Sequence, residues 1–381
     1  MWIGLVGSEM CIRDRNGGSG DPPAIDGVTV RKVRWARIPM EFTRSYGKYA
    51  LKELRRLHSN DPVDVVHLHC PMISWTKKQF KTCKEEISPI VSSLHGSWLG
   101  ERDGLRIASE LKEAAVWANP NDLAILLTGG YYSGFENAAL SGSTVCVANS
   151  QATKQDFTER YSPPIGWDCE VIHWGVDTEM FIPLTVESTQ TKLIRERYSV
   201  PEDGKLLLAV GRLAARKGYS SLLRSFSKVN KKIPGARLVI IGRGHLKKRL
   251  EKLSRRLGIG EHVTIESSLP FEDLALLFRI SDLVVYPSYY EGQGLIPLEA
   301  MASGTPVVTV DHGPLPEMVD DTVGKLFTMG DNDSMASAII GEIENPEKLL
   351  EKGILGRERV LEKYTYESNA SRFSEIYSRI V

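Results

Sequence analysis

Short, almost uninterrupted apolar runs alternate along the chain with longer segments whose apolar residues recur at helical spacing. Uninterrupted apolar runs are typical of strands that are buried on both faces, as in parallel sheets. They occupy residues 63–68, 89–94, 144–148, 205–210, 236–241, 283–286 and 307–310. The pattern therefore predicts an α/β protein, and the length of 381 residues suggests two or three domains.

The clearest unit covers residues 281–310, where a strand, a glycine-containing loop, a helix and a second strand follow one another. The loop holds Glu291, Gly292 and Gly294, and Glu299 lies in the first turns of the helix. This order places a helix N-terminus beside an anion, and the glycines let the backbone approach a ligand closely. Two carboxylates converging there suit a polyol that carries a phosphate. The alternative is a surface glutamate and an ordinary helix glutamate.

The stretch EGQGLIPLEAMASGTPVV resembles the Glu-x7-Glu signature of glycosyltransferase family 4, whose members are retaining, nucleotide-sugar-dependent enzymes of the GT-B fold. Gln293 stands where an aromatic residue is common, and Ile296-Pro297 exchanges the usual order of proline and apolar residue. The resemblance implies two Rossmann-like doubly wound domains that face a cleft. We expect an acceptor-side domain at residues 21–183, a donor domain at 184–363 and a final helix, 364–381, that crosses back to the first domain.

A second motif, GRLAARKG at residues 211–218, follows a predicted buried strand and precedes a helix predicted at 219–230. It resembles the family's G-R-L-x-x-x-K-G motif. The resemblance implies that Arg212 and Lys217 neutralise the diphosphate of the donor. Fixed cations and amides at a helix start stabilise the charge that grows on this leaving group. The alternative is a basic turn that caps the sheet.

The resemblance also implies a role for each remaining donor contact. Glu291 would hold sugar hydroxyls, Glu299 the nucleotide ribose, and the loop amides the sugar and diphosphate. The donor-binding set is Gly211, Arg212, Lys217, Gly292, Gln293, Gly294, Leu295 and Glu299. The catalytic set is His95, Glu291, Arg212 and Lys217.

Histidines gather near the ends of two predicted strands of the first half, where ligands of parallel sheets collect. His95-Gly96 resembles the family's His-Gly, whose imidazole lies near the donor sugar. His69 could contact the acceptor, although packing at a strand end is the commoner role. We expect no metal site at His67 and His69, because further ligands are missing. Asp331-Asn332-Asp333 is better explained as a helix N-cap than as a metal-nucleotide motif.

Composition narrows the class of protein. Lys+Arg and Asp+Glu both count 48, so no global charge favours nucleic acid or an acidic membrane. Five scattered cysteines without a CxxC favour a reducing cytoplasm. No apolar run approaches the roughly 18 residues that span a bilayer. Basic residues at helical spacing in 42–58 leave peripheral membrane contact open, although a solvated face is the simpler interpretation.

The first residues, MWIGLVGSEMCIRDR, do not fit the start of this fold and resemble translated adapter DNA. We expect residues 1–20 to be non-native or disordered, and the first βα unit to be missing.

The predicted activity is sugar transfer from a nucleoside-diphosphate sugar, which is a substrate and not a cofactor. The acceptor would be the hydroxyl of a sugar, a lipid or a small molecule, and no nucleic acid takes part. Two alternatives remain: an isomerase resembling nucleotide-sugar 2-epimerases, and a truncated protein that binds the donor without turnover.

Overall fold

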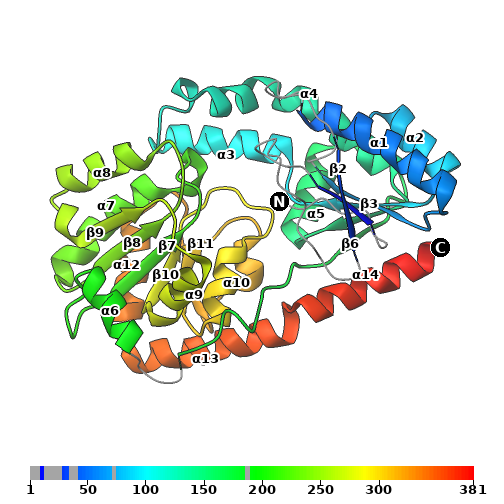
Figure 1. Ribbon diagram of the computed structural model, residues 1–381. Helices are drawn as coiled ribbons and strands as arrows, with labels where there is room; N and C mark the ends of the chain where they lie inside the picture. Colours follow the sequence, from blue (N-terminus) through cyan, green and yellow to red (C-terminus); the bar gives the residue numbers. More distant parts are fainter. Residues whose placement is uncertain (1–8, 13–27, 34–41, 71–73, 185–188) are drawn as a thin grey trace. The chain divides into compact units, whose positions relative to one another are not determined.

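A computed structural model describes residues 9–12, 28–33, 42–70, 74–184 and 189–381, and Figure 1 shows the course of the chain. The chain forms two compact units, which are described separately. The first comprises Met1–Arg102, Leu123–His173 and Ala370–Val381; the second comprises Asp103–Asp122 and Trp174–Asn369. This division differs from the linear boundary expected near Pro183. Residues 103–122 group with the second unit because Glu113 hydrogen bonds to it, as described below.

Near the N-terminus, β1 (Glu9–Ile12) pairs in parallel with β2 (Thr29–Lys32) in a two-stranded sheet. Residues 1–8 and 13–27 lie outside the described residues. The expected foreign segment at residues 1–20 and the expected absence of the first βα unit therefore stay predictions.

The first unit contains a four-stranded parallel sheet in the order β3-β4-β5-β6. Its strands are β3 (Val66–Cys70), β4 (Ile90–Leu94), β5 (Val145–Ala148) and β6 (Cys169–Val171). Most strand residues are buried, as the apolar runs predicted. The helices of this part of the chain are α1 (Phe42–Asn60), α2 (Lys77–Glu86), α3 (Trp98–Glu110), α4 (Pro120–Gly142) and α5 (Gln151–Arg160).

Hydrophobic clusters fill both faces of this sheet. The larger cluster joins β3, β4 and β5 to side chains of α1, α2, α4 and α5, including Leu54 and Phe157. The smaller one joins Val91 and Val147 to Ile376 of α14 (Tyr366–Ile380). The last helix of the chain therefore covers one face of the first unit's sheet, and residues from Ala370 onward belong to that unit.

The second unit contains a six-stranded parallel sheet in the order β12-β11-β10-β7-β8-β9. Its strands are β7 (Leu206–Val210), β8 (Arg237–Ile241), β9 (Val263–Glu266), β10 (Leu283–Tyr286), β11 (Val307–Val310) and β12 (Gly324–Phe327). The chain runs outward from β7 to β9, returns to the other side of β7, and runs outward again from β10 to β12. The order reverses between β7 and β10. Ligands of such sheets bind at the carboxyl ends of the strands at this switch point.

The connecting segments of the second unit are mostly helices. They are α6 (Thr189–Arg197), α7 (Tyr219–Lys232), α8 (Lys247–Arg256), α9 (Phe271–Ile280), α10 (Leu295–Ala302), α11 (Leu315–Met318), α12 (Asn332–Ile343) and α13 (Pro346–Lys363), with 3-10 turns at Val116–Ala118, Ala215–Lys217 and Gly260–His262. α7 contacts α8 and α12, whereas α10 contacts α9 and α13. Among the described residues, no helix combines the length and apolarity that a bilayer crossing requires.

Candidate active site

The two motifs of the second unit meet at its switch point. Lys217 ends the 3-10 turn after β7, and Glu291 lies in the loop after the neighbouring β10. The ammonium group of Lys217 forms an ion pair with Glu291 Oε1, and these side chains are only 10% and 13% exposed. The Tyr286 hydroxyl donates to the same Oε1 at 2.6 Å and lies 3.1 Å from Lys217 Nζ. A cation, an anion and a phenol thus form one buried cluster.

Burial sets the protonation properties of this cluster. It lowers the pKa of Lys217 to about 8, helped by the charges of Arg216 and Arg212, although Glu291 acts in the opposite direction. Burial alone would raise the pKa of Glu291, but the charges of Lys217 and Arg216 outweigh it and hold this pKa below its ordinary value. Burial and the Glu291 charge raise the pKa of Tyr286, so its hydroxyl stays a donor.

Backbone contacts hold the two loops together. Tyr289 N donates to Arg216 O at 2.8 Å, which links the β10 loop to the β7 loop. Gly218 has a φ of 70°, and a Cβ there would lie 2.1 Å from Pro287 O. Only glycine fits this close approach, because an L side chain is disfavoured at that φ and the carbonyl occupies the space. The glycine that ends the basic motif is therefore required to bring Lys217 to Glu291.

The second carboxylate of the Glu-x7-Glu motif lies on α10. Glu299 is half-buried, and burial raises the pKa of its carboxyl to about 7. The helix begins at Leu295, and its N-cap, Gly294, has a φ of 97° and contributes no side-chain cap. A helix start without a side-chain acceptor is suited to an anionic ligand.

Gln293, predicted to contact the donor, uses its side chain for another purpose. It is 1% exposed, and its Oε1 accepts from Trp174 N at 2.6 Å while its Nε2 donates to Trp174 O at 3.0 Å. Both polar atoms of the amide are engaged by backbone. Any donor contact of this residue would therefore come from its main chain.

The remaining predicted residues of the β7 loop lie beside Lys217. Gly211 follows β7 directly, and Arg212 is exposed. The charge of Arg212 acts on the pKa of Lys217, which places this guanidinium near the ion pair. Three cations, Arg212, Arg216 and Lys217, therefore gather after β7, and the charges of Lys217 and Arg216 act on Glu291.

In the first unit, His95 follows β4 directly and bonds to a histidine of β3. The distance between His69 Nδ1 and His95 Nε2 is 2.7 Å, and the two rings are stacked. Burial lowers the pKa of His69 to about 4 and holds the pKa of His95 well below its ordinary value. Both imidazoles are therefore neutral near pH 7. His67 lies deeper, between Ser93 Oγ at 2.6 Å and the Tyr377 hydroxyl at 2.8 Å, where it has a packing role.

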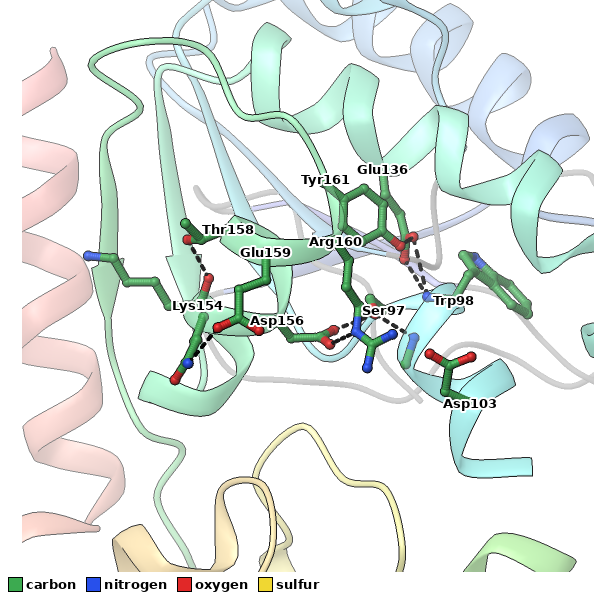
Figure 2. A network of polar contacts seen from close by, with 12 residues as sticks. Ser97, Trp98, Asp103, Glu136, Lys154, Asp156, Thr158, Glu159, Arg160 and Tyr161 are labelled. Carbon is green, nitrogen blue, oxygen red and sulfur yellow. Dashed lines mark hydrogen bonds and ion pairs between the residues drawn. The ribbon is translucent and has the colours of Figure 1, made fainter. Parts of the chain in front are cut away.

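A buried carboxylate, Glu136, and a partly buried one, Asp156, fix the chain just after His95, as Figure 2 shows. Glu136 of α4 accepts from Trp98 N at 3.0 Å and from the Tyr161 hydroxyl. Ser97 caps α3 by accepting from Gly100 N, and its own hydroxyl donates to Asp156. Burial raises the pKa of Glu136 to about 8. The start of α3, and with it the His95-Gly96 turn, is anchored to α4 and α5.

Asp331, the first residue of the Asp-x-Asp stretch, is the N-cap of α12. Its Oδ1 accepts from Asp333 N at 2.8 Å and from Ser334 N at 2.9 Å. The capping prediction is confirmed.

Several residues of the site were missed from the sequence. Tyr286 lies at the end of an apolar strand, where a phenol is easily interpreted as core, although its place just before the Glu291 loop was a usable signal. Tyr289 and Glu113 were also missed. Glu113 lies far from both motifs in sequence, and nothing in its local pattern indicates the contact.

Comparisons with known proteins agree with this architecture. The model described as "Glycosyltransferase Family 4" matches residues 12–180, and the model described as "Glycosyl transferases group 1" matches residues 190–357. Sucrose-phosphate synthase from Thermosynechococcus elongatus has a similar structure, with a TM-score of 0.76 at 20% identity over 97% of this chain and 88% of that one.

Two curated relatives extend the comparison. A GDP-mannose-dependent alpha-(1-6)-phosphatidylinositol monomannoside mannosyltransferase of Mycolicibacterium smegmatis is 28% identical over 60% of this chain. The match covers only 60% of that relative's own length. An uncharacterized glycosyltransferase of Methanocaldococcus jannaschii is 27% identical over 93% of this chain and 85% of its own length.

Two parallel-sheet α/β units with a cationic cluster at a switch point define a protein of the GT-B glycosyltransferase class, and the predicted fold class is confirmed. With family models matching both halves of the sequence, the chain belongs to glycosyltransferase family 4.

Proposed function

We propose that this protein transfers a sugar from a nucleoside-diphosphate sugar to an acceptor hydroxyl with retention of the anomeric configuration. The Lys217–Glu291 pair carries the proposal. Its opposite charges are largely buried, and they lie at the switch point of the second sheet, where ligands of such sheets bind. The relative from Mycolicibacterium smegmatis is named for a nucleotide-sugar donor, which supports the same donor class here.

Each charge of the pair has a partner in the proposed donor. The diphosphate would bind Lys217, Arg212 and the amides of Gly292 to Gly294. Hydroxyls of the sugar would donate hydrogen bonds to Glu291. Glu299 accepts from the ribose, which requires its ionised form. Before the donor binds, Lys217 and Glu291 thus hold each other in position. When the donor binds, its diphosphate and its sugar hydroxyls would replace these mutual contacts.

Bond cleavage in the donor places negative charge on the departing diphosphate, and the cations stabilise that charge most in the transition state. The acceptor oxygen bonds to the anomeric carbon on the face that the diphosphate leaves, and its proton passes to a phosphate oxygen. No covalent nucleophile is assigned. His95, neutral near pH 7, can donate one hydrogen bond to the sugar. Because protein cations supply the positive charge, we propose that no divalent metal is required.

Features of the first unit support a proposal for the acceptor and the compartment. α1 exposes Arg44, Lys48 and Lys52, and neighbouring α4 exposes Leu127 (74%) and Tyr131 (55%). The Arg44 guanidinium lies 6.0 Å from the centre of the Tyr131 ring, so these basic and apolar side chains share one face. Such a face fits an anionic bilayer, and we propose a lipid-linked acceptor reached by peripheral contact. The buried free thiols Cys70, Cys83, Cys146 and Cys169 support a reducing cytoplasm.

A panel of nucleotide sugars, including GDP-mannose and UDP-glucose, tests the donor class by thermal shift, because a ligand of the native state raises the melting temperature. Product analysis with and without acceptor then tests the reaction. We expect donor-dependent transfer that folded Lys217→Ala lacks. Donor conversion without acceptor would favour the epimerase, and binding without product would favour a protein that binds the donor without turnover. Full turnover by Lys217→Ala would refute the assignment.

A further inference from the structure

Glu113, which neither motif contains, lies completely buried in the second unit, at 0% exposure. Its carboxylate accepts three hydrogen bonds. Oε2 accepts from Ser220 N at 2.7 Å, and Oε1 accepts from Ser221 N at 2.9 Å and from the Tyr289 hydroxyl at 2.8 Å. A buried carboxylate with three donors is fixed in one orientation.

The contact caps α7 from outside the helix. The N-cap of α7 is Gly218, which has no side chain to accept from the first amides. The Glu113 carboxylate fills that role at Ser220 and Ser221, where the helix dipole also favours a negative charge. The amides at the start of α7 are therefore already engaged. The expectation was that a helix start beside the basic motif serves the diphosphate, but the Ser220 and Ser221 amides are occupied by Glu113. The start of α10, which follows the Glu291 loop, has no side-chain cap.

The segment around Glu113 has further anchors in the same unit. Ser220 Oγ donates to Glu113 O at 3.0 Å, and Arg224 donates to Lys112 O at 3.3 Å. Asp122 lies 3.6 Å from His245 Nε2. Residues 103–122 thus belong to the donor-side unit although they lie within the first half of the sequence.

Glu113 joins the two loops that carry the Lys217–Glu291 pair. On one side its partners begin three residues after Lys217, and on the other Tyr289 lies two residues before Glu291. One further link, from Tyr289 N to Arg216 O, connects the same loops. Resting on the proposed function, the geometry points to Glu113 as a positioning residue that sets the distance between Lys217 and Glu291 for donor binding.

A carboxylate that only stabilised the fold would change the melting temperature and nothing else. A positioning residue also changes Lys217, because proximity of Glu291 raises the Lys217 pKa against burial and the neighbouring charges of Arg216 and Arg212. If the loops separate, Lys217 loses that support and deprotonates at lower pH. The pH above which nucleotide binding weakens is therefore the readout that distinguishes the two roles.

The experiment measures UDP and GDP binding by calorimetry, from about pH 6 to about pH 9.5, in four full-length proteins. These are the wild type, Glu113→Gln, Tyr289→Phe and the control Glu342→Gln. Glu342 is also a buried glutamate of the second unit, but it pairs with Lys352 at 2.7 Å. Tyr289→Phe removes a single hydroxyl and keeps the test decisive if Glu113→Gln does not fold.

We expect Glu113→Gln to bind the nucleotide about tenfold more weakly near neutral pH, with the alkaline midpoint moved to lower pH. Tyr289→Phe should shift the alkaline midpoint in the same direction by a smaller amount. Glu342→Gln should lower the melting temperature but leave the alkaline midpoint unchanged. Wild-type affinity and midpoint in Glu113→Gln, or in Tyr289→Phe if only that variant folds, would overturn the inference and leave the proposed function standing. Failure of the wild type to bind any nucleoside diphosphate or nucleotide sugar would overturn the proposed function, and this inference with it.

Discussion

Replacing Lys217 with methionine should destabilise the protein much more than replacing Glu291 with glutamine. Lys217→Met leaves the Glu291 carboxylate in a site where each side chain of the pair is only about a tenth exposed. Removing one partner of a buried ion pair costs about 3–5 kcal/mol. Because some exposure remains and Tyr286 still donates to Glu291, we expect the lower end, about 3 kcal/mol near pH 8.

The opposite substitution is milder because lysine can lose its proton. In Glu291→Gln, Lys217 has no anion to hold its charge, but its pKa is already about 8. Deprotonation near pH 8 therefore requires little free energy, and we expect a loss of about 1 kcal/mol, the equivalent of less than one pKa unit. The double variant buries neither charge and should also lose about 1–2 kcal/mol, which gives a coupling energy of about 2 kcal/mol.

Urea unfolding followed by circular dichroism near pH 8 measures the free energy of unfolding of the wild type, the two single variants and the double variant. Near pH 5.5 the penalty of Lys217→Met should shrink, because the unpaired Glu291 can then take up a proton. A cycle at Lys352 and Glu342, whose side chains are 4% and 6% exposed, is the control. It should also show coupling but leave nucleotide binding intact. Wild-type stability in Lys217→Met, or a coupling energy near zero, would refute the electrostatic account.

Two further predictions concern pH and membranes. Nucleotide affinity should rise through about pH 7 as Glu299 ionises and fall beyond about pH 8 as Lys217 loses its proton. Calorimetry across this pH range would show the maximum, and Glu299→Gln should remove the rise on its acidic side. Undiminished affinity at high pH would contradict the assignment of Lys217. Sedimentation with vesicles containing phosphatidylglycerol should show binding that weakens as salt is added and in the double variant Lys48→Glu/Leu127→Ser. The control Leu350→Ser should bind like the wild type, because Leu350, although 68% exposed, lies on α13 and not on this face. Equal binding by all three proteins would exclude the α1–α4 face.

The sequence predicted the fold because the signal for parallel sheets is local. Each buried strand is an uninterrupted apolar run that can be read from its own residues. The runs at 205–210 and 283–286 are examples, and the structure has a strand in each. Parallel pairing then leaves few arrangements, and it brings the ends of β7 and β10 together. Lys217 and Glu291 could therefore be assigned to one donor site before the structure, since both follow such strands, although their ion pair was not predicted.

Long-range contacts account for what the sequence did not predict. Glu113 contacts residues more than 100 positions away, and no local periodicity records such a contact. The division into compact units differs from the expected linear boundary for the same reason, since hydrogen bonds of Glu113 attach residues 103–122 to the second unit. Tyr286 was overlooked because a tyrosine at the end of an apolar strand is explained by burial alone. Its hydrogen bond to Glu291 leaves no separate signal in the sequence.

One departure from the family pattern is held in place by a residue outside both motifs. Gln293 stands where an aromatic residue is common, and its amide binds both backbone groups of Trp174. The Glu291 loop is thus held at Tyr289 by Glu113, at Glu291 by Lys217, and at Gln293 by Trp174. Two of these three anchors, Glu113 and Trp174, lie outside both the Glu-x7-Glu motif and the GRLAARKG motif. On the proposed function, the motif would supply the groups that meet the donor, whereas Glu113 and Trp174 would position those groups. We therefore expect that variation at residues 113 and 174 changes nucleotide binding while the motif stays intact.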